Sequence, residues 1–376
     1  MVTSPTSAAQ TETRLPAVRP VPPLRIVFFG TPAFAVPSLD ALIAARPHQV
    51  VGVVTQPDRP RGRGQKLSDA PVKARAVEAG LPILQPERMK DPAFLAALAA
   101  LNADLGVVAA YGRILTDAIL AIPRLGMINV HASILPKYRG AAPVHRAVIA
   151  GESSTGVTIM RVVKALDAGP TIVKEHHSVG PDETSDEVER ALAKIGARLI
   201  VPVVDLLARN NAAEYPQDEA LATYAPRLTK DDGVIDWSWP AVRVHNLIRG
   251  LHPWPHAFSF LHGKRFILLR SEANPPDLPF QPSPPGTVLE AAGDRLIVAT
   301  GDGLLRIVEI QAEGKRPMTV RDFLAGHRLA AGDRFSTTVR LKPDSTDETT
   351  VLLKPDTTDE TNIPPVSSKP DTINGS

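Results

Sequence analysis

Arg25-Ile-Val-Phe-Phe29 is the first of four short apolar runs that decide the fold of this chain. The other three are Gln49-Val-Val-Gly-Val-Val54, Leu105-Gly-Val-Val-Ala109 and Met127-Ile-Asn-Val-His131. Between them lie stretches with apolar residues at helical spacing, at 37–45, 72–79 and 92–101. Strands that are continuously apolar and alternate with helices predict a parallel sheet covered on both faces. A later helix is predicted from Thr184 to about Leu207, because Glu187 completes a capping box with Thr184.

The pattern changes after a polar, irregular stretch at 210–227. Beyond it, little helix is expected before 320–324, and short strand-like pieces stand between turns at 257–261, 265–269, 286–289, 295–299 and 304–310. This is typical of a small β-barrel. The residues therefore predict an α/β domain at 24–209, a linker at 210–227 and a barrel domain at 228–334. We expect a disordered leader at 1–23 and a disordered, low-complexity tail at 335–376.

The composition excludes several classes of protein. The chain has 376 residues, of which 43% are hydrophobic, enough for two ordinary cores. It has no cysteine, so disulfides, thiolate zinc sites and cysteine nucleophiles are excluded. Its net charge of +2 means that any surface for nucleic acid must be local. No apolar run approaches the roughly 18–20 residues that cross a bilayer, so no membrane partner is expected.

Two polar residues stand at the end of the fourth run. Asn129 and His131 are two positions apart, so their side chains share one face of the strand. They fall at its carboxyl end, where open α/β sheets bind ligands. Either residue alone would be read as structural, but a loop containing Arg139 follows, and a further acid, Asp167, stands in Leu166-Asp-Ala-Gly169. The first turn, Phe29-Gly-Thr-Pro32, lacks the glycine pattern of a dinucleotide site.

From 24 to about 333 the chain resembles the folate-dependent formyltransferases, and most of all those members that act on methionyl-tRNA. The matching motifs are Phe29-Gly-Thr-Pro32, Thr55-Gln-Pro-Asp-Arg-Pro60, Asn129-Val-His-Ala-Ser-Ile-Leu-Pro136, Leu166-Asp-Ala-Gly169, Ile235-Asp-Trp237 and Pro253-Trp-Pro255. The resemblance implies a doubly wound parallel sheet followed by a small OB-like β-barrel. It also implies 10-formyltetrahydrofolate as donor, methionyl-initiator tRNA as acceptor, no metal, and a monomeric, cytoplasmic enzyme of translation initiation.

The same resemblance assigns the site. The catalytic residues it implies are Asn129, His131 and Asp167. The loop it implies for folate is Ser133, Ile134, Leu135 and Pro136, and the pterin pocket is lined by Arg113, Ile114 and Leu115. The chain departs from the family at Ala132, where glycine is usual, at Ile134, which replaces leucine, and at Pro170, where many relatives carry an acid. These differences concern the pocket's fine geometry.

These residue types suit formyl transfer. Attack by an amine places negative charge on the formyl oxygen, which requires hydrogen-bond donors already in position. Asn129 and His131 are expected to donate there, and Asp167 is expected to hold the charged form of His131 and to help remove the amine proton through water. The adjacent His176 and His177 are not expected to bind a metal, because neighbours on a strand face opposite ways.

A basic segment follows the second strand. Its cations, against the single Asp58, are Arg59, Arg61, Arg63 and Lys66. Charge alone equally describes a solvated, mobile loop, whereas the resemblance favours contact with tRNA phosphates. In the barrel, tryptophans are expected mostly in the core or an interface, and phosphate contact is expected from Lys230, Lys264, Lys315 and Arg316.

Three other functions compete with this hypothesis. The same Asn/His/Asp set would serve formylation of an amino-sugar nucleotide, which predicts no role for Arg61. It would also serve hydrolysis of formyl-folate, with water as acceptor and no use for a barrel. A catalytically inactive RNA-binding module is disfavoured, because Asn129, His131 and Asp167 are all present.

Overall fold

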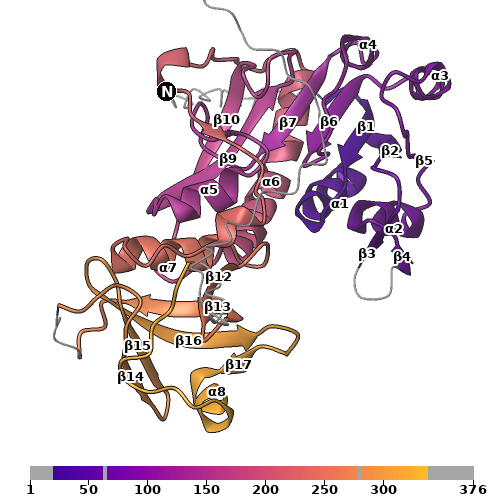
Figure 1. Ribbon diagram of the computed structural model, residues 1–376. Coiled ribbons are helices and arrows are strands. Elements are labelled where there is room, and N and C mark those ends of the chain that lie inside the picture. The colour runs from indigo at the N-terminus through magenta and orange to yellow at the C-terminus, as the bar shows by residue number, and fades with distance from the viewer. Residues whose placement is uncertain (1–19, 62–65, 278–281, 338–376) are drawn as a thin grey trace, which may run out of the picture.

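The computed structural model describes residues 20–61, 66–277 and 282–337, which form two domains (Figure 1). The first contains a seven-stranded sheet in the order β10-β9-β7-β6-β1-β2-β5. Its strands are β1 (Arg25–Gly30), β2 (Gln49–Val54), β5 (Ile83–Leu84), β6 (Leu105–Ala109), β7 (Met127–His131), β9 (Ser154–Arg161) and β10 (Thr171–Ser178). The five strands from β5 to β7 are parallel, and β9 is antiparallel to both of its neighbours. The predicted α/β fold with a mainly parallel sheet is confirmed.

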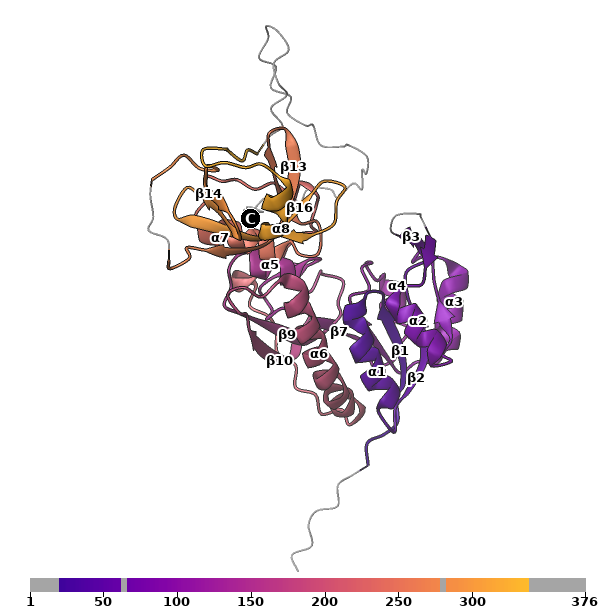
Figure 2. The same ribbon diagram turned by 90° about the horizontal axis from the view of Figure 1, so that it is seen from below.

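Helices cover both faces of this sheet. They are α1 (Val36–Ala44), α2 (Pro71–Glu78), α3 (Pro92–Ala100), α4 (Asp117–Leu120), α5 (Pro143–Ile149) and α6 (Ser185–Ala208), with a short 3-10 turn, η1 (Ala33–Ala35). Because side chains alternate along a strand, Ile26 and Phe28 of β1 enter one core with α1 and α6, whereas Val27 and Phe29 enter a second core with α3. Figure 2 shows α1 and α6 side by side on one face.

The long helix α6 begins at the capping box that the sequence predicts. Thr184 is its N-cap, and the Glu187 carboxylate accepts hydrogen bonds from the Thr184 hydroxyl (2.6 Å) and amide (2.8 Å). These bonds, helped by Arg270 of the barrel, lower the pKa of Glu187 to about 2. At Gly196 the helix comes so close to β7 that an added Cβ would lie 2.7 Å from Val130. The helix is therefore fixed against the strand that carries Asn129 and His131.

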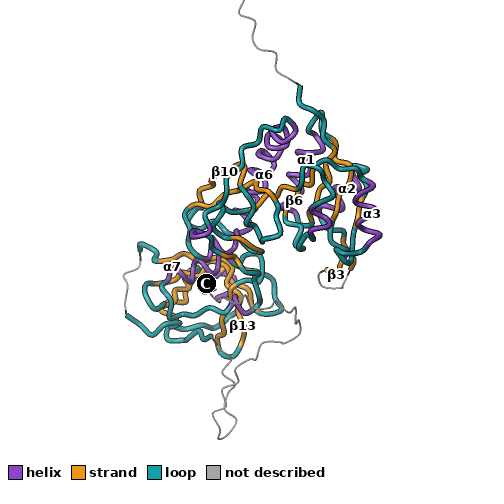
Figure 3. The backbone as a smooth tube through the Cα atoms, turned by 90° about the horizontal axis from the view of Figure 1, so that it is seen from above, coloured by secondary structure: helices purple, strands orange, loops and turns teal. Residues whose placement is uncertain are grey.

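The second domain is a small antiparallel barrel (Figure 3). Its strands follow the order β12-β13-β16-β15-β14, with β17 beside β16. They are β12 (Ala257–Leu261), β13 (Lys264–Ala273), β14 (Val288–Ala292), β15 (Arg295–Ala299), β16 (Leu304–Ala312) and β17 (Met318–Thr319), followed by α8 (Val320–Gly326). Residues 334–336 bridge the two open edges, since Arg334 pairs with Thr287 and Ser336 with Phe260. The barrel thus extends to Ser336, beyond the predicted limit at 334.

One helix of this domain differs from expectation. The sequence analysis expected little helix before 320, but α7 (Ala241–Gly250) precedes the first barrel strand, after η3 (Asp231–Gly233). Val244, Leu247, Ile248 and Leu251 point into the barrel core, and α7 packs against α5 of the first domain. Its apolar residues do follow the helical spacing i, i+3, i+4, so the signal was present in the sequence.

The segment between the domains is hydrogen-bonded to the first domain along its length. Tyr215 pairs with Thr171 at the start of β10, and β11 (Tyr224–Ala225) pairs in parallel with β8 (Arg139–Gly140). A 3-10 turn, η2 (Glu219–Leu221), lies between these contacts. The predicted linker at 210–227 is therefore built onto the loops that follow β7 and β9.

Candidate active site

The site lies at the carboxyl edge of the parallel strands. From β1 the chain proceeds to β2 and β5 on one side, and then returns to β6 and β7 on the other. Such a change of direction leaves a crevice beside the ends of the two central strands, here β1 and β6, where ligands bind in folds of this type. β7 is the next strand, and its last residues carry the predicted pair.

Asn129 and His131 project from the same face of β7. Asn129 is partly exposed, and its carboxamide makes no hydrogen bond with any of the residues that the structure describes. His131 is 5% exposed, and its Nε2 lies 3.0 Å from the carbonyl oxygen of Tyr138. A carbonyl only accepts, so Nε2 carries a proton and donates it, which leaves Nδ1 facing the site. The strand therefore presents one unpartnered amide and one imidazole nitrogen.

Asp167 reaches His131 from the turn between β9 and β10. Its Oδ2 lies 3.7 Å from His131 Nδ1 and accepts a hydrogen bond of 2.8 Å from the amide of Gly140. At 3.7 Å the carboxylate oxygen and the imidazole nitrogen are too far apart for a direct hydrogen bond. The backbone of Asp167 has a φ of 47°, in the left-handed region that Asp tolerates better than most residues.

The predicted folate loop is held in place by buried side chains and by hydrogen bonds to β9. Ser133 and Leu135 are fully buried, and the Ser133 hydroxyl donates to the carbonyl of Lys137. The Thr158 hydroxyl donates to the carbonyl of Ser133 and accepts from the amide of Leu135. Ile134 and Pro136 are partly exposed. The buried side chains shape this loop, whereas Ile134 and Pro136 remain accessible to a ligand.

The predicted pterin residues have three different surroundings. The Arg113 guanidinium donates to the carbonyls of Pro86 and Glu87, which ties its loop to the segment after β5. Leu115 packs against the second core. Ile114 is 80% exposed. Among the three, Ile114 presents the apolar surface that a ligand at this edge can cover.

Sequence reasoning noted Arg139 and missed Gln217 and Glu219, the two residues that connect Arg139 with the support of Asp167. Arg139 is 1% exposed, and it donates to the Gln217 side-chain oxygen (2.8 Å) and to the Glu219 carboxylate (2.8 Å). Gln217 in turn donates to the carbonyls of Asp167 (2.7 Å) and Gly169 (2.8 Å). Gln217 stands 50 residues from Asp167 in the chain, and no local pattern joins them.

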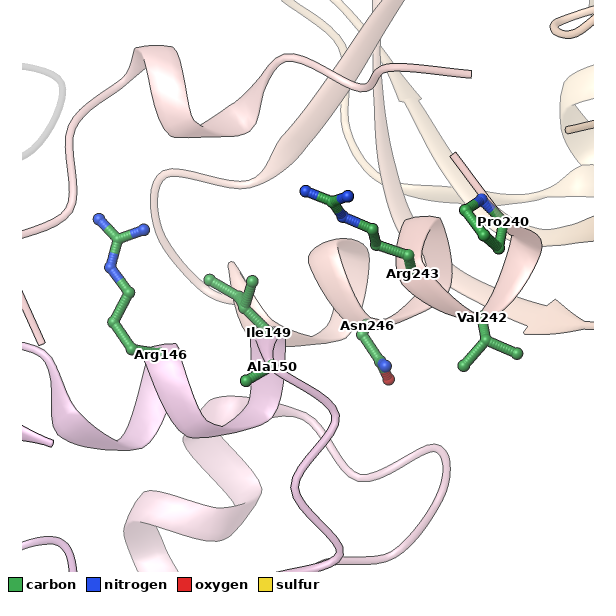
Figure 4. A pocket seen from close by; sticks show the side chains of 7 residues that line it. All are labelled: Arg146, Ile149, Ala150, Pro240, Val242, Arg243 and Asn246. Atoms are coloured by element: carbon green, nitrogen blue, oxygen red, sulfur yellow. The ribbon is translucent and has the colours of Figure 1, made fainter. Parts of the chain in front are cut away.

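A hollow of about 490 Å³ lies between α5 and α7, and its lining includes none of the predicted site residues. It is lined by Arg146, Ile149, Ala150, Pro240, Val242, Arg243 and Asn246. Figure 4 shows the Arg146 and Arg243 side chains extending in the same direction from their helices. Arg146 is paired with Asp232 at 2.8 Å, and the Arg243 guanidinium lies 3.7 Å from the centre of the Trp239 ring. The hollow is therefore basic, and it lies where the two domains meet.

The basic segment forms a hairpin. Its strands β3 (Arg59–Arg61) and β4 (Lys66–Ser68) are antiparallel, and Arg63 lies outside the described residues. Of the barrel tryptophans, Trp237 is 3% exposed and donates to the Ser259 hydroxyl at 2.8 Å, so it belongs to the core. Trp254 is 51% exposed. Trp254 is accordingly available for contact, whereas Trp237 is not.

Neither a metal cluster nor a membrane helix is found in the described ranges. Within 20–61, 66–277 and 282–337, no group of three His, Cys, Asp or Glu residues could hold a metal ion. In the same ranges no helix is long and apolar enough to span a bilayer.

Two family models match the chain. The formyl transferase model covers residues 24–204, and the formyl transferase C-terminal domain model covers 227–328. Methionyl-tRNA formyltransferase of Desulfotalea psychrophila is 49% identical over 315 residues, which are 84% of this chain and 96% of that protein. The enzyme of the same name from Moorella thermoacetica is 46% identical, covering 82% of this chain and 98% of that one.

Solved structures share the fold. A sugar 3N-formyl transferase with dTDP and 5-N-formyl-THF has a TM-score of 0.56 at 17% identity, and the match covers 78% of this chain and 99% of that one. The N-formyltransferase of Helicobacter canadensis, with folinic acid and dTDP-3-aminofucose, has a TM-score of 0.57 at 16% identity, over 76% of this chain and 98% of that one. At these identities the likeness concerns the fold alone.

Proposed function

The chain belongs to the methionyl-tRNA formyltransferase family, and we propose that it moves the formyl group of 10-formyltetrahydrofolate to the amino group of methionyl-initiator tRNA at Asn129, His131 and Asp167. The observation that supports this assignment is the 3.7 Å approach of Asp167 to His131 beside the unpartnered amide of Asn129. Two groups from strand β7 and one from a separate turn meet at the edge where such sheets bind ligands. The reaction serves translation initiation.

The donor fits this edge of the sheet. A part-exposed amide without a protein partner is a group that a ligand satisfies, and Asn129 is such a group. Ile114, Ile134 and Pro136 offer apolar surface to a flat ring, with Arg113 and Leu115 holding the loop that carries Ile114. The buried Ser133 and Leu135 keep the facing loop in place. In this proposal the donor brings an already activated formyl group, and the protein supplies position and charge.

Asn129 and His131 stabilise the charge that develops on the formyl oxygen. The Asn129 amide is a donor with no competing acceptor among the described residues. His131 is oriented by its Nε2 bond to Tyr138, which directs Nδ1 toward Asp167 and the site. When Nδ1 is protonated, it too is a donor, and the Asp167 carboxylate lies 3.7 Å from it. Donors fixed before the reaction need no reorganisation during it.

Asp167 also provides a route for the amine proton. A free α-amino group has a pKa of about 7.7–8.0, so near neutral pH it is mostly protonated and must lose a proton before or during attack. The separation of 3.7 Å between Asp167 and His131 leaves the carboxylate accessible to the amine or to an intervening water. The Gly140 amide holds the carboxylate in that position. When the tetrahedral adduct collapses, the bond between the formyl carbon and the donor nitrogen breaks, and the proton lost by the amine balances the one that this nitrogen gains, so tetrahydrofolate leaves.

The acceptor RNA binds across the side that carries both the barrel and the basic hairpin. Figures 1 and 2 show the β3–β4 hairpin and the barrel extending from the same side of the sheet domain. Arg59, Arg61, Arg63 and Lys66 contact backbone phosphates near the acceptor end, in keeping with the loop's charge. The basic hollow at Arg146 and Arg243 offers a second place for a phosphate. We place the enzyme in the cytoplasm as a monomer.

The deciding experiment mixes the purified protein with 10-formyltetrahydrofolate and charged initiator tRNA, and measures formylmethionine. The proposal predicts formylated methionine that depends on both substrates. Formate release without tRNA would instead indicate a hydrolase. Formylation of a dTDP-amino sugar, with no product on tRNA, would indicate an amino-sugar enzyme. Light scattering on the same sample tests the monomer, since a mass of twice 40.2 kDa would contradict it.

A further inference from the structure

Residues 214–225, here called the strap, run between the turn that carries Asp167 and the loop that follows β7. At one end the Arg161 guanidinium donates to Glu214 (2.7 Å), and Tyr215 pairs with Thr171, next to the turn that carries Asp167. At the other end the carbonyl of Thr223 accepts from the amide of Arg139 (2.8 Å), and its hydroxyl accepts from the amide of Tyr138 (2.9 Å). The strap therefore connects the turn of Asp167 to the loop whose Tyr138 carbonyl orients His131.

Gln217 is the residue of the strap that reaches Asp167. It is partly buried, whereas its neighbours from 213 to 216 and from 218 to 220 are exposed, so its side chain alone in this run turns inward. Its Nε2 donates to the carbonyls of Asp167 and Gly169, the two residues that flank Ala168 at the tip of the turn. Its oxygen accepts from Nε and Nη2 of the buried Arg139. Both ends of the amide are thus in use.

The turn of Asp167 needs such support. Asp167 has a φ of 47°, and a residue in this region costs free energy that surrounding contacts must offset. The turn packs closely against β9, since a Cβ added at Gly169 would lie 2.0 Å from the main-chain oxygen of Arg161. On its outer side the hydrogen bonds from Gln217 are the ones that fix the main chain on each side of Ala168. Without them, the carboxylate is free to leave the amide of Gly140.

We propose that Gln217 is a positioning residue for catalysis, which holds the Asp167 carboxylate at His131, so that the interdomain strap is part of the catalytic machinery. The inference rests on the proposed function in one respect, namely that Asp167 acts in the formyl transfer. Gln217 itself touches neither substrate. It acts through the main chain of the Asp167 turn, which links the segment leading to the barrel with the reacting groups.

The test is the substitution Gln217→Glu. A carboxylate keeps the acceptor for Arg139 and strengthens that pair, but it has no N–H to donate to the two carbonyls. We expect kcat to fall about 10-fold to 100-fold, the range that a misplacement of about 1 Å produces, with both KM values changed by less than about threefold. The stronger pair with Arg139 is expected to offset the two lost hydrogen bonds, so the unfolding temperature should stay close to the wild-type value. A residue needed only for folding would lose activity and stability together.

Two further variants and one physical measurement complete the test. Gln311→Glu makes the same chemical change in β16 of the barrel, where Gln311 donates to the carbonyl of Lys315, and it should match wild type. Glu219→Gln weakens the other partner of Arg139 and should lower the unfolding temperature, with a smaller loss of kcat than Gln217→Glu because the hydrogen bonds from Gln217 to the turn of Asp167 remain. Amide hydrogen exchange at Gly140, whose N–H donates to Asp167, should accelerate in Gln217→Glu and not in Gln311→Glu.

The possible results separate this inference from the proposed function. A Gln217→Glu enzyme with kcat within about threefold of wild type, or one with unchanged exchange at Gly140, overturns the positioning role. A wild-type protein that formylates no tRNA overturns the proposed function, yet the exchange measurement still decides whether Gln217 holds Asp167. A fall in kcat together with faster exchange at Gly140, at undiminished unfolding temperature, establishes the inference.

Discussion

Replacing Asn129 with alanine removes a hydrogen-bond donor that does not contribute to the stability of the fold, so it tests the donor's part in the reaction alone. The side chain lies near the carboxyl end of β7, is partly exposed, and makes no hydrogen bond with the described part of the protein. Its removal leaves no buried group unpaired and opens no closed cavity. The free energy of unfolding should therefore change by no more than about 0.5 kcal/mol, as for substitutions away from packed or paired positions. Any loss of activity then results from weaker stabilisation of the transition state and not from unfolding.

The expected loss follows from the role as an oxyanion donor. Removing one such donor typically lowers kcat by about 10²–10³, equivalent to about 2.7–4 kcal/mol of transition-state stabilisation. Asn129→Asp should be slower still. A carboxylate at about 4 Å from the developing charge repels it by about 4 kcal/mol at an effective dielectric constant of about 20. The order of rates is therefore wild type, then alanine, then aspartate.

The assay is formylation of charged initiator tRNA at saturating 10-formyltetrahydrofolate, with kcat and both KM values measured and unfolding temperatures recorded alongside. Asn211→Ala, an exposed asparagine after α6, is the matched control and should behave as wild type. An Asn129→Ala enzyme within about threefold of wild-type kcat would refute the assignment, because no oxyanion donor is that dispensable. An aspartate variant faster than the alanine variant would refute the electrostatic reasoning.

Three further predictions rest on other parts of the molecule. Arg61→Ala should raise the KM for tRNA and reduce the salt dependence of binding by about one phosphate contact, with the KM for folate unchanged; an unchanged KM for tRNA would instead favour an amino-sugar acceptor. Gly169→Ala should abolish most activity and lower the unfolding temperature, since the added Cβ would lie 2.0 Å from a main-chain oxygen and displace the turn of Asp167. Glu187 has a folded-state pKa of about 2, below its ordinary 4.5, so its stabilisation is present above about pH 4.5 and disappears as the pH falls toward 2. In thermal melts Glu187→Gln should therefore cost about 1 kcal/mol at pH 7, the value of a helix cap at a partly exposed position, and progressively less below pH 4.5.

Features that depend on neighbouring residues were predictable from the sequence. The four apolar runs form β1, β2, β6 and β7, because strands that are buried on both faces have continuously apolar sequences. The capping box at Thr184 was predictable, since both of its partners lie within one turn. The common face of Asn129 and His131 follows from the two-residue period of a strand. Asp167 was a different case, because the sequence showed only a further acid along the chain and the resemblance gave that acid its catalytic role.

Features that depend on distant residues were not predictable. The bonds from Gln217 to Asp167 and Gly169 span 50 and 48 residues, and those from Arg139 to Gln217 span 78. In the sequence Gln217 stands among polar residues, which is also the pattern of a solvated linker. Its inward orientation results from the pairing of Tyr215 with Thr171, which is a tertiary contact. The composition of a segment can indicate that it connects two domains, but it does not indicate which residues of those domains its side chains contact.

The contact between the domains explains why the barrel keeps one orientation relative to the first domain. The Arg249 guanidinium of α7, only 6% exposed, donates to the carbonyls of Gly180 and Glu183, and burial lowers its pKa. The buried hydroxyl of Ser185, the first residue of α6, donates to the carbonyl of Gly250 at 2.7 Å. Buried polar groups are stable only when each finds its partner, so they specify one orientation of the barrel far more narrowly than apolar packing does. Because these partners lie just before and at the start of α6, at the edge that carries Asn129, the barrel and the reacting groups keep a constant separation.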